Sequence, residues 1–286
     1  MKSQETPPLP TLKYLEDKLS GYPDLLFAVG FAMKAGQYMR AERDRAIYRL
    51  KPDGTRVTDV EQDINDVFLT EANELTNSLG DIIGEEGSSR VINGRVSWLI
   101  DPIDGTRQYT DSNTKKLNEK SRHSSIGIAK IDSGVLTTAV VMNPFRGELY
   151  YSDRKLGGAY LNSSHLELAR LGLDQAEFSP DMRYNYTFYK GASFDRKRIR
   201  NLMENKPSGH IGSTLYQACM VARGLLAFSV FPGRSAHDIA PGALMVELSG
   251  GQVSDIEGAP LDWKRPNGAI YAVSRSVHET VVGSLR

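Results

Sequence analysis

The sequence predicts a layered α/β fold, with helices and sheets packed around a large buried core. Segments with helical periodicity alternate with strand-like segments, and most connections between them are short. The chain has 286 residues, enough for one large or two modest domains. Its 40% hydrophobic and 24% charged residues are ordinary for a globular protein. These observations together favour a mixed globular fold.

Helical patterns come first along the chain. Residues 11–49 carry helical periodicity, with few helix breakers after Pro23. The turn-rich stretch KPDGTR at 51–56 follows. A second amphipathic helix is expected from Asp59 to about Leu79.

Short strands follow between residues 81 and 160, mostly separated by Gly, Asn or Pro. They are DIIGEE, VSWLID, SSIGIAKI, GVLTTAVVMNP and GELYYSD. The later part predicts helices at 195–205, 213–224 and 238–250 and a strand at 225–231. We therefore expect an N-terminal half at 1–160 and a C-terminal half at 161–286. The long polar segment 107–124 is either a functional loop or a surface excursion.

Bulk properties exclude several classes of protein. Thirty-five basic and 35 acidic residues give zero net charge, so no global field favours a nucleic acid polymer or an anionic membrane. The single Cys219 excludes an internal disulfide and fits a reducing cytoplasm. Residues 1–10 lack the apolar core of a signal peptide. The apolar run 217–231 is broken by Arg223 and Gly224, which is typical of a buried helix and strand.

Three acidic motifs stand where an element begins or ends. They are GEE at 84–86, DPIDGT at 101–106 and AHDIAPG at 236–242. Such carboxylates can converge on one rim, where they would repel one another unless a cation were present. An all-oxygen ligand set favours a hard ion, above all Mg²⁺.

Each motif also has a plainer explanation. Asp, Pro and Gly are common turn formers, and Asp238 can act as a helix N-cap. His237 stands next to Asp238, but the histidines are scattered and a ligand role for it is the weaker interpretation. Gly105 permits close backbone approach to an anion, and its amide and that of Thr106 can hold a phosphate oxygen if a helix begins there.

The motifs GEE, WLIDPIDGT and HDIAPGALMVELSGG resemble, in order and spacing, the signatures of the inositol monophosphatase family. These are magnesium-dependent, lithium-sensitive phosphatases, related to fructose-1,6-bisphosphatases and 3′-phosphoadenosine-5′-phosphate phosphatases. The resemblance spans residues 25–275 and includes GGAYLN at 157–162, IGS at 211–213 and GQVSDIEGAPLD at 251–262. It implies a sandwich of alternating helix and sheet layers, a small phosphorylated substrate and a homodimer.

The resemblance also assigns the metal ligands. Two Mg²⁺ ions, with a third and weaker one, are expected on Glu85, Asp101, the carbonyl of Ile103, Asp104 and Asp238. Asp101 is shared between the two main ions, and Glu86 is expected to remain off the metal. Two cations bridged by a carboxylate can clamp a phosphate and activate the attacking water.

In the family, the threonine after DPIDG hydrogen-bonds an upstream aspartate, and the pair helps to activate water. Thr106 holds the threonine position, but Glu61 stands where the aspartate is expected. Asp59 lies two positions early, on a different face of a helix. A misplacement on the order of 1 Å can cost about 100-fold in rate. The substitution therefore bears on the rate, and the reaction class is retained.

Substrate choice is less constrained. Inositol-binding members carry a glutamate seven residues before the aspartate of the third motif, and Phe231 stands there, which argues against a simple inositol monophosphatase. Arg234 and Arg107, and more weakly Lys190, are candidates to contact a second phosphate, or else solvated surface charges. The phosphate side of the site is expected to comprise Gly105, Thr106, Ser213 and Arg234.

The expected function is a Mg²⁺-dependent phosphomonoesterase acting on a small polyol, sugar or nucleotide phosphate. A bisphosphate phosphatase, acting on fructose 1,6-bisphosphate or a 3′,5′-bisphosphonucleotide, is the alternative. A non-catalytic protein that binds a phosphorylated ligand is a third interpretation, which the complete set of acidic motifs opposes.

Overall fold

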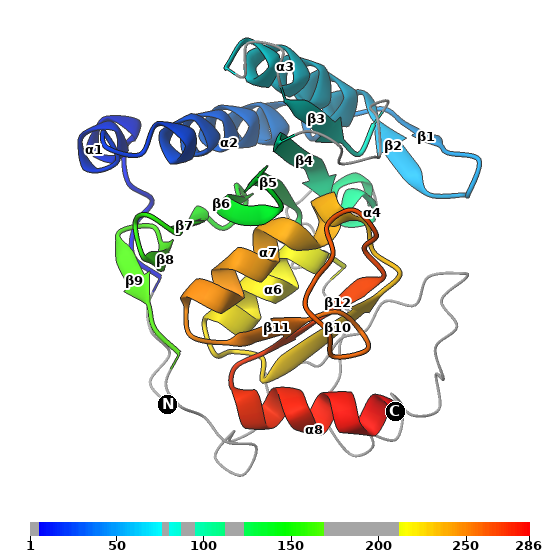
Figure 1. The fold of residues 1–286 in the computed structure, drawn as a ribbon. Coiled ribbons are helices and arrows are strands. Elements are labelled where there is room, and N and C mark those ends of the chain that lie inside the picture. Colours follow the sequence, from blue (N-terminus) through cyan, green and yellow to red (C-terminus); the bar gives the residue numbers. More distant parts are fainter. Residues whose placement is uncertain (1–5, 76–79, 87–94, 112–122, 169–211) are drawn as a thin grey trace.

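The computed structural model describes residues 6–75, 80–86, 95–111, 123–168 and 212–286. It confirms the layered α/β fold. Helices α1–α3 cover one face of a large mixed sheet, and α6 and α7 cover the other face (Figure 1). Below them lie a small sheet and then α8 (Figure 1). Helix and sheet layers therefore alternate through the molecule.

The first layer is helical. It contains α1 (Leu12–Lys18), α2 (Pro23–Glu42) and α3 (Asp59–Leu75). Pro23 stands in the first turn of α2, where its missing N–H costs no hydrogen bond. The KPDGTR stretch is the turn of a hairpin of β1 (Tyr48–Leu50) and β2 (Arg56–Thr58), which links α2 to α3.

The large sheet has the order β3-β4-β5-β6-β7-β8-β9. Its strands are β3 (Asp81–Gly84), β4 (Val96–Asp104), β5 (Ser125–Asp132), β6 (Val135–Asn143), β7 (Glu148–Asp153), β8 (Gly158–Leu161) and β9 (Ser164–Leu166). Strands β3 and β4 are parallel, and all other neighbours are antiparallel. The short helix α4 (Thr106–Thr110) begins two residues after β4 ends.

The remaining layers come from the C-terminal part. They are α6 (Thr214–Ala222), α7 (Ala236–Leu248), the sheet of β10 (Phe228–Pro232), β12 (Gly268–Ala272) and β11 (Gln252–Ser254), and α8 (Arg275–Leu285). Helix α6 lies beside α7, between the two sheets. The loops that lead into these two helices carry residues of the candidate site.

The large sheet separates two hydrophobic cores. On β4, Trp98 and Ile100 face the core under α1–α3, whereas Leu99 faces the core around α6 and α7. Ile128 and Ala129 of β5 divide in the same way. This alternation is the side-chain period of a strand, and burial on both faces explains why β4 and β5 are almost continuously apolar.

The sequence patterns located most of these elements but not all. Strands β8, β9, β11 and β12 and helix α8 were not expected, and the hairpin was expected only as a turn. The helix at 195–205 and Lys190 lie outside the described residues. The division into halves at residue 160 stays a prediction. Within the described ranges, no helix is long and apolar enough to cross a membrane.

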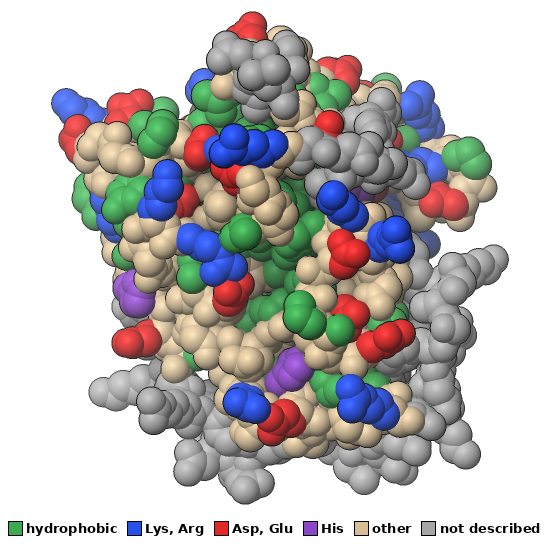
Figure 2. Space-filling model, viewed as in Figure 1, with side chains coloured by type: hydrophobic (Ala, Val, Ile, Leu, Met, Phe, Trp, Pro, Cys, Tyr) green, Lys and Arg blue, Asp and Glu red, His purple; other side chains and the backbone are tan. Residues whose placement is uncertain are grey.

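Acidic and basic side chains are interspersed on the face seen in Figure 2, and neither sign forms a continuous patch there. Equal numbers of the two charges in the sequence account for a mixed surface of this kind.

Candidate active site

The GEE motif is the end of β3 and the turn that follows it. The Glu85 N–H donates to the carbonyl of Ile100 on β4 at 3.2 Å, and the Asn65 side-chain amide on α3 donates to the carbonyl of Glu86 at 2.8 Å. A Cβ on Gly84 would lie 1.9 Å from Oδ1 of Asn65. Only glycine therefore fits this close approach of helix to strand, and the turn is fixed from both sides.

The DPID motif lies within an irregularity of β4. Asp101 pairs with Gly127 and Asp104 with Ser125, and the register shifts between these two pairs. Pro102 lacks an N–H and suits a position outside the ladder. Asp101 is 1% exposed, and its Oδ1 has no hydrogen-bond partner. The shift thus brings two acidic residues close together on one buried strand.

Asp104 is bound by the start of α6. Its Oδ2 accepts from the Ser213 hydroxyl at 2.7 Å and from the Leu215 N–H at 2.6 Å. The Ser213 oxygen also accepts from the Tyr216 N–H at 3.0 Å, which makes Ser213 the N-cap of α6. The Ser213 side chain therefore caps α6 and also holds Asp104, a predicted metal ligand. Ser213 was predicted to contact the phosphate, and in this structure its hydroxyl is engaged by Asp104 and the Tyr216 N–H instead.

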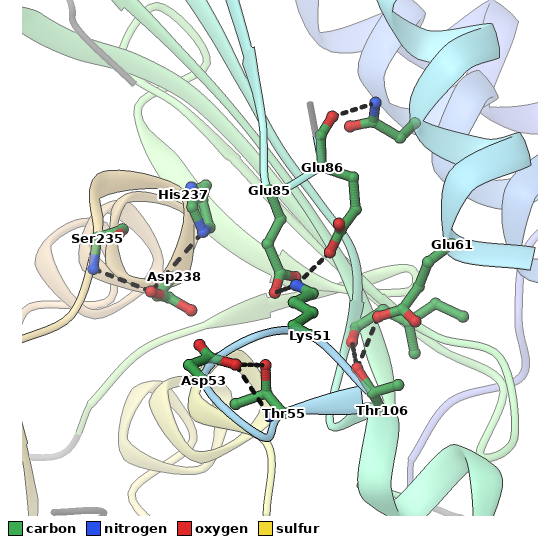
Figure 3. A network of polar contacts seen from close by, with 12 residues as sticks. Lys51, Asp53, Thr55, Glu61, Glu85, Glu86, Thr106, Ser235, His237 and Asp238 are labelled. Atoms are coloured by element: carbon green, nitrogen blue, oxygen red, sulfur yellow. Dashed lines mark hydrogen bonds and ion pairs between the residues drawn. The ribbon is translucent and has the colours of Figure 1, made fainter. Parts of the chain in front are cut away.

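Asp238 lies in the first turn of α7, at its third residue. Its Oδ2 accepts from the Ser235 N–H at 2.9 Å, and its Oδ1 lies 3.4 Å from the Arg234 guanidinium. Nε2 of His237 is 3.8 Å from Oδ2 of Asp238 (Figure 3). The plainer interpretation of Asp238 as the N-cap is wrong: Ser235 is the N-cap of α7, and Asp238 is the third helical residue, whose carboxylate accepts from the Ser235 N–H in a capping box.

Glu61 makes two sets of contacts at once. Its Oε2 accepts from the Thr58 N–H at 2.6 Å while its own N–H donates to the Thr58 hydroxyl oxygen at 3.0 Å, a reciprocal capping box at the start of α3. Its Oε1 accepts from the Thr106 hydroxyl at 2.6 Å. The longer side chain of glutamate spans both partners. The stretch TDVE at 58–61 matches the Ser/Thr-x-x-Glu pattern of a capping box, although no capping box was predicted there.

Gly105 and Thr106 join β4 to α4. Gly105 has a φ of 89°, which favours glycine, and its carbonyl accepts from the Tyr109 N–H at 3.0 Å. A Cβ there would lie 3.1 Å from the carbonyl oxygen of Gly212. A short helix does begin at Thr106, as the suggested phosphate contact requires.

The acidic side chains share an unfavourable field. Burial raises the pKa of Asp101 well above its ordinary value, and the charges of Glu85 and Asp104 add to this. Burial raises the pKa of Asp104 to about 6, against the opposing charge of Arg234 and the Ser213 hydrogen bond. Burial and the charge of Glu85 raise the pKa of Glu61 to about 8. The site therefore holds more negative charge than its own contacts neutralise.

The donor chemistry fits divalent ions. All the candidate ligands are oxygen atoms, and the buried Oδ1 of Asp101 lacks a partner in the structure. In the described part of the chain, however, no three Asp, Glu, His or Cys side chains are gathered as a ready coordination shell. Each flanking carboxylate is instead turned toward a partner of its own: Glu85 toward Lys51, Asp104 toward Ser213, and Asp238 toward Ser235 and Arg234.

Lys51 is the site residue that the sequence patterns did not reveal. It lies at the hairpin turn after β1, and its ammonium group reaches both Glu85, at 2.8 Å, and Glu86 (Figure 3). The contact joins residues 34 positions apart. A lysine in a turn-rich segment looks like an ordinary solvated charge in the sequence.

The residues predicted to influence substrate choice differ in how far they are buried. Phe231 is fully buried and packs edge-on against Tyr271, so it belongs to the core of the small sheet. Arg107 is exposed on α4. Arg234 is largely buried beside Asp238.

The fold and these motifs define a class of layered α/β phosphatases. The chain belongs to the inositol monophosphatase family, whose family model matches residues 23–286. An inositol-1-monophosphatase of Mesorhizobium japonicum is 26% identical over 262 residues, which cover 89% of this chain and 93% of that protein. Nus factor SuhB of Xylella fastidiosa is 31% identical over 208 residues, covering 71% and 70%.

Solved structures agree on the fold. The Thermotoga maritima IMPase superposes with a TM-score of 0.74 at 22% identity, covering 94% of this chain and 96% of that one. An IMPase/NADP phosphatase solved with Mg²⁺ and phosphate gives a TM-score of 0.73 at 18% identity, with 97% of both chains covered.

A further sequence relative has another name. Histidinol-phosphatase of Mycobacterium tuberculosis is 25% identical over 271 residues, covering 92% of this chain and 98% of that protein. The relatives of this chain are thus named after different substrates: inositol monophosphate, NADP and histidinol phosphate.

Proposed function

We propose that the protein is a Mg²⁺-dependent phosphomonoesterase acting on a small phosphorylated polyol, sugar or nucleotide. The observation that carries the proposal is the 2.6 Å hydrogen bond from Thr106 to Glu61, beside the buried Asp101. This pairing is the one that the family uses to activate water, and it forms here despite the change from aspartate to glutamate. A non-catalytic ligand-binding protein would have no evident need for it.

The residues proposed to hold the metal are Glu85, Asp101, the Ile103 carbonyl, Asp104 and Asp238. Bound divalent ions would supply Lewis-acid activation of water and neutralise charge on the phosphate and the leaving group. Asp101 would be the ligand shared between the ions, as the family resemblance implies. This role is supported by its buried Oδ1, which has no hydrogen-bond partner in the protein, and by a pKa that burial and the neighbouring carboxylates raise.

Thr106 and Glu61 would orient the attacking water. The Thr106 hydroxyl has one proton, and donation of it in the hydrogen bond to Glu61 leaves the oxygen lone pairs available to accept a hydrogen bond from the attacking water. Glu61 fixes that direction because its other oxygen is bound by the Thr58 N–H. The amides of Gly105 and Thr106, at the start of α4, would bind phosphate oxygens.

The candidate second-phosphate contacts favour a monophosphate as the first choice. Arg234 lies against Asp238, and its charge also acts on Asp104, so a second phosphate would compete with both carboxylates for it. The buried Phe231 leaves the inositol-binding position of the family without a polar group. Bisphosphates therefore remain the alternative substrate class, with inositol phosphates not specially favoured.

A panel of phosphate esters tests the proposal. Phosphate release should be measured with Mg²⁺, with EDTA, and with Mg²⁺ plus Li⁺, on inositol 1-phosphate, histidinol phosphate, NADP, fructose 1,6-bisphosphate and a 3′,5′-bisphosphonucleotide. We expect Mg²⁺-dependent release from at least one ester, and inhibition by Li⁺. No release from any ester, with unchanged ligand binding, would favour the non-catalytic interpretation. Cytoplasmic location and a homodimer also remain proposals.

A further inference from the structure

Glu148 is a buried carboxylate that the proposed mechanism does not use. It is the first residue of β7 and is 1% exposed. The Arg223 guanidinium donates to its Oε1 at 3.3 Å, and the Tyr150 hydroxyl donates to its Oε2 at 3.0 Å. Nε of Arg146 lies 3.4 Å from the same Oε1. Buried hydrogen bonds to a charged group are strong, so these contacts fix the elements that carry them relative to one another.

The partners of Glu148 come from the large sheet and from α6. Arg146 and Tyr150 belong to the same sheet hairpin as Glu148, whereas Arg223 is the C-cap of α6. Tyr216 lies in the first turn of that helix. Burial, and then the charge of Glu148 and a hydrogen bond with it, raise the pKa of Tyr216 above its ordinary value. One carboxylate on the sheet therefore reaches both ends of a nine-residue helix.

The same helix holds a proposed metal ligand at its start. Asp104 accepts from the Ser213 hydroxyl at 2.7 Å and from the Leu215 N–H at 2.6 Å. The Tyr216 N–H donates to the Ser213 oxygen at 3.0 Å, so the direction of that hydroxyl depends on the helix. A displacement of α6 by about 1 Å would lengthen the contacts to Asp104 beyond the usual hydrogen-bond range.

Water has little access to the contact between Glu148 and Arg223. The side chains are 2% and 12% exposed, respectively. Thr6, which lies upstream of the residues that the family model matches, contacts both of them. Its hydroxyl donates to Oε1 of Glu148 at 3.4 Å and accepts from Arg223 at 3.4 Å. A buried ion pair of this kind is screened much less than a pair on the surface.

We propose that Glu148 and Arg223 are positioning residues, which brace α6 against β7 and thereby orient Asp104 for metal binding. The inference rests on the metal-dependent function proposed above. The two residues act through α6, the Ser213 hydroxyl and the Asp104 carboxylate, and they touch neither the metal nor the substrate. Without the brace, Asp104 loses its fixed direction, and the affinity for the ion that it helps to hold falls.

Arg223→Met is the first test, because Glu148 keeps Arg146 as a counter-ion and is not left as an unpaired buried charge. Calorimetry on the full chain gives the Mg²⁺ and Mn²⁺ affinities. We expect Arg223→Met to bind both ions about tenfold more weakly, as for loss of a residue that orients a metal ligand. Arg223→Lys should recover part of the affinity, since it restores the charge.

Arg154→Met is the matched control. Arg154 pairs with Glu247 near the C-terminal end of α7, and the two side chains are 36% and 46% exposed. The substitution therefore removes one arginine from an ion pair between the sheet and a different helix. Because exposed pairs contribute little, the metal affinities should change less than about twofold.

A double-mutant cycle separates positioning from a general loss of stability. Ser213→Ala removes the hydroxyl that joins the start of α6 to Asp104. In that background Arg223→Met has less left to disturb, and it should weaken Mg²⁺ binding by no more than about threefold. Thermal unfolding in EDTA identifies a temperature at which every variant is folded, and all affinities are compared there. If Arg223→Met does not fold, Arg223→Gln takes its place in both comparisons.

The outcomes distinguish this inference from the proposed function. Wild type that binds neither ion overturns the proposed metal site itself. Wild type that binds the ions, with unchanged affinity in Arg223→Met, rejects the brace. A loss that Arg154→Met shares, or that adds in full to the loss in Ser213→Ala, would assign the effect to charge or stability and would also reject it.

Discussion

The Thr106 hydroxyl donates a 2.6 Å hydrogen bond to Glu61, which also closes the capping box at the start of α3. The proposed activation of water and the stability of the start of α3 would therefore depend on the same carboxylate. An aspartate would be shorter by one methylene and would have to give up one of the two contacts. The glutamate is consistent with a local geometry that differs from that of the family pattern.

Glu61→Gln should lower kcat by about 10²–10⁴-fold while KM and Mg²⁺ affinity change little, because the lost interaction supports water activation and not binding. Glu61→Asp should keep partial activity. Steady-state kinetics on the best substrate of the panel provide the measurement. Asp63→Asn is the control, since Asp63 is an exposed carboxylate of the same helix that pairs with Tyr38. A Gln variant as fast as wild type would remove Glu61 from the mechanism.

Asp101→Asn should abolish activity and metal binding, yet stabilise the metal-free protein. The amide keeps the shape but removes an acid whose ionised form is opposed by burial and by the charges of Glu85 and Asp104, so the free energy of unfolding in EDTA should rise. Thermal unfolding with EDTA and with Mg²⁺ measures both effects. Asp132→Asn, at a partly exposed position, should retain the response to Mg²⁺. An equal Mg²⁺ stabilisation in Asp101→Asn would refute the shared-ligand role.

The stability of the metal-free protein should fall as pH rises through the window set by Glu61. Its pKa is raised from 4.5 to about 8 in the folded state, so between these values the folded chain holds a proton that the unfolded chain has lost. The free energy of unfolding then decreases with pH, by up to about 1.4 kcal/mol per pH unit for this proton.

Glu61→Gln isolates that contribution. Denaturant unfolding in EDTA at pH 5, 6, 7 and 8 should give a less negative slope for the variant than for wild type. Saturating Mg²⁺ should weaken the wild-type slope, since a cation favours ionised carboxylates. Identical slopes for the two proteins in EDTA would show that Glu61 does not titrate in this window.

Gly84→Ala should destabilise the protein by about 1–3 kcal/mol, because the new methyl group would overlap Oδ1 of Asn65. The loss should be smaller in an Asn65→Ala background, where the overlap is removed. Denaturant unfolding of the two single variants and the double variant gives the coupling. Gly21→Ala, where a Cβ meets nothing within 4 Å, is the control. Equal losses in both backgrounds would show that Asn65 is not the cause.

The sequence by itself determined the fold class, most helices and strands, and the acidic motifs. These features are local: a helix or strand repeats its apolar residues with a fixed period, and β4 is apolar on both faces because both are covered. Together with the family resemblance, they also sufficed to single out Glu61 as the unusual position.

Only the tertiary structure decided which partners those residues have. Lys51 meets Glu85 across 34 positions, and Ser213 meets Asp104 across 109, through contacts that no local period encodes. Strands β11 and β12 went unrecognised because Gly and short length weaken the strand pattern in QVS and GAIYA. Phe231 could be placed near the substrate by its sequence position, but packing against Tyr271 buries it in the core. Charge pairing and burial depend on elements that meet only in the folded chain, and these contacts set the field around the acidic residues.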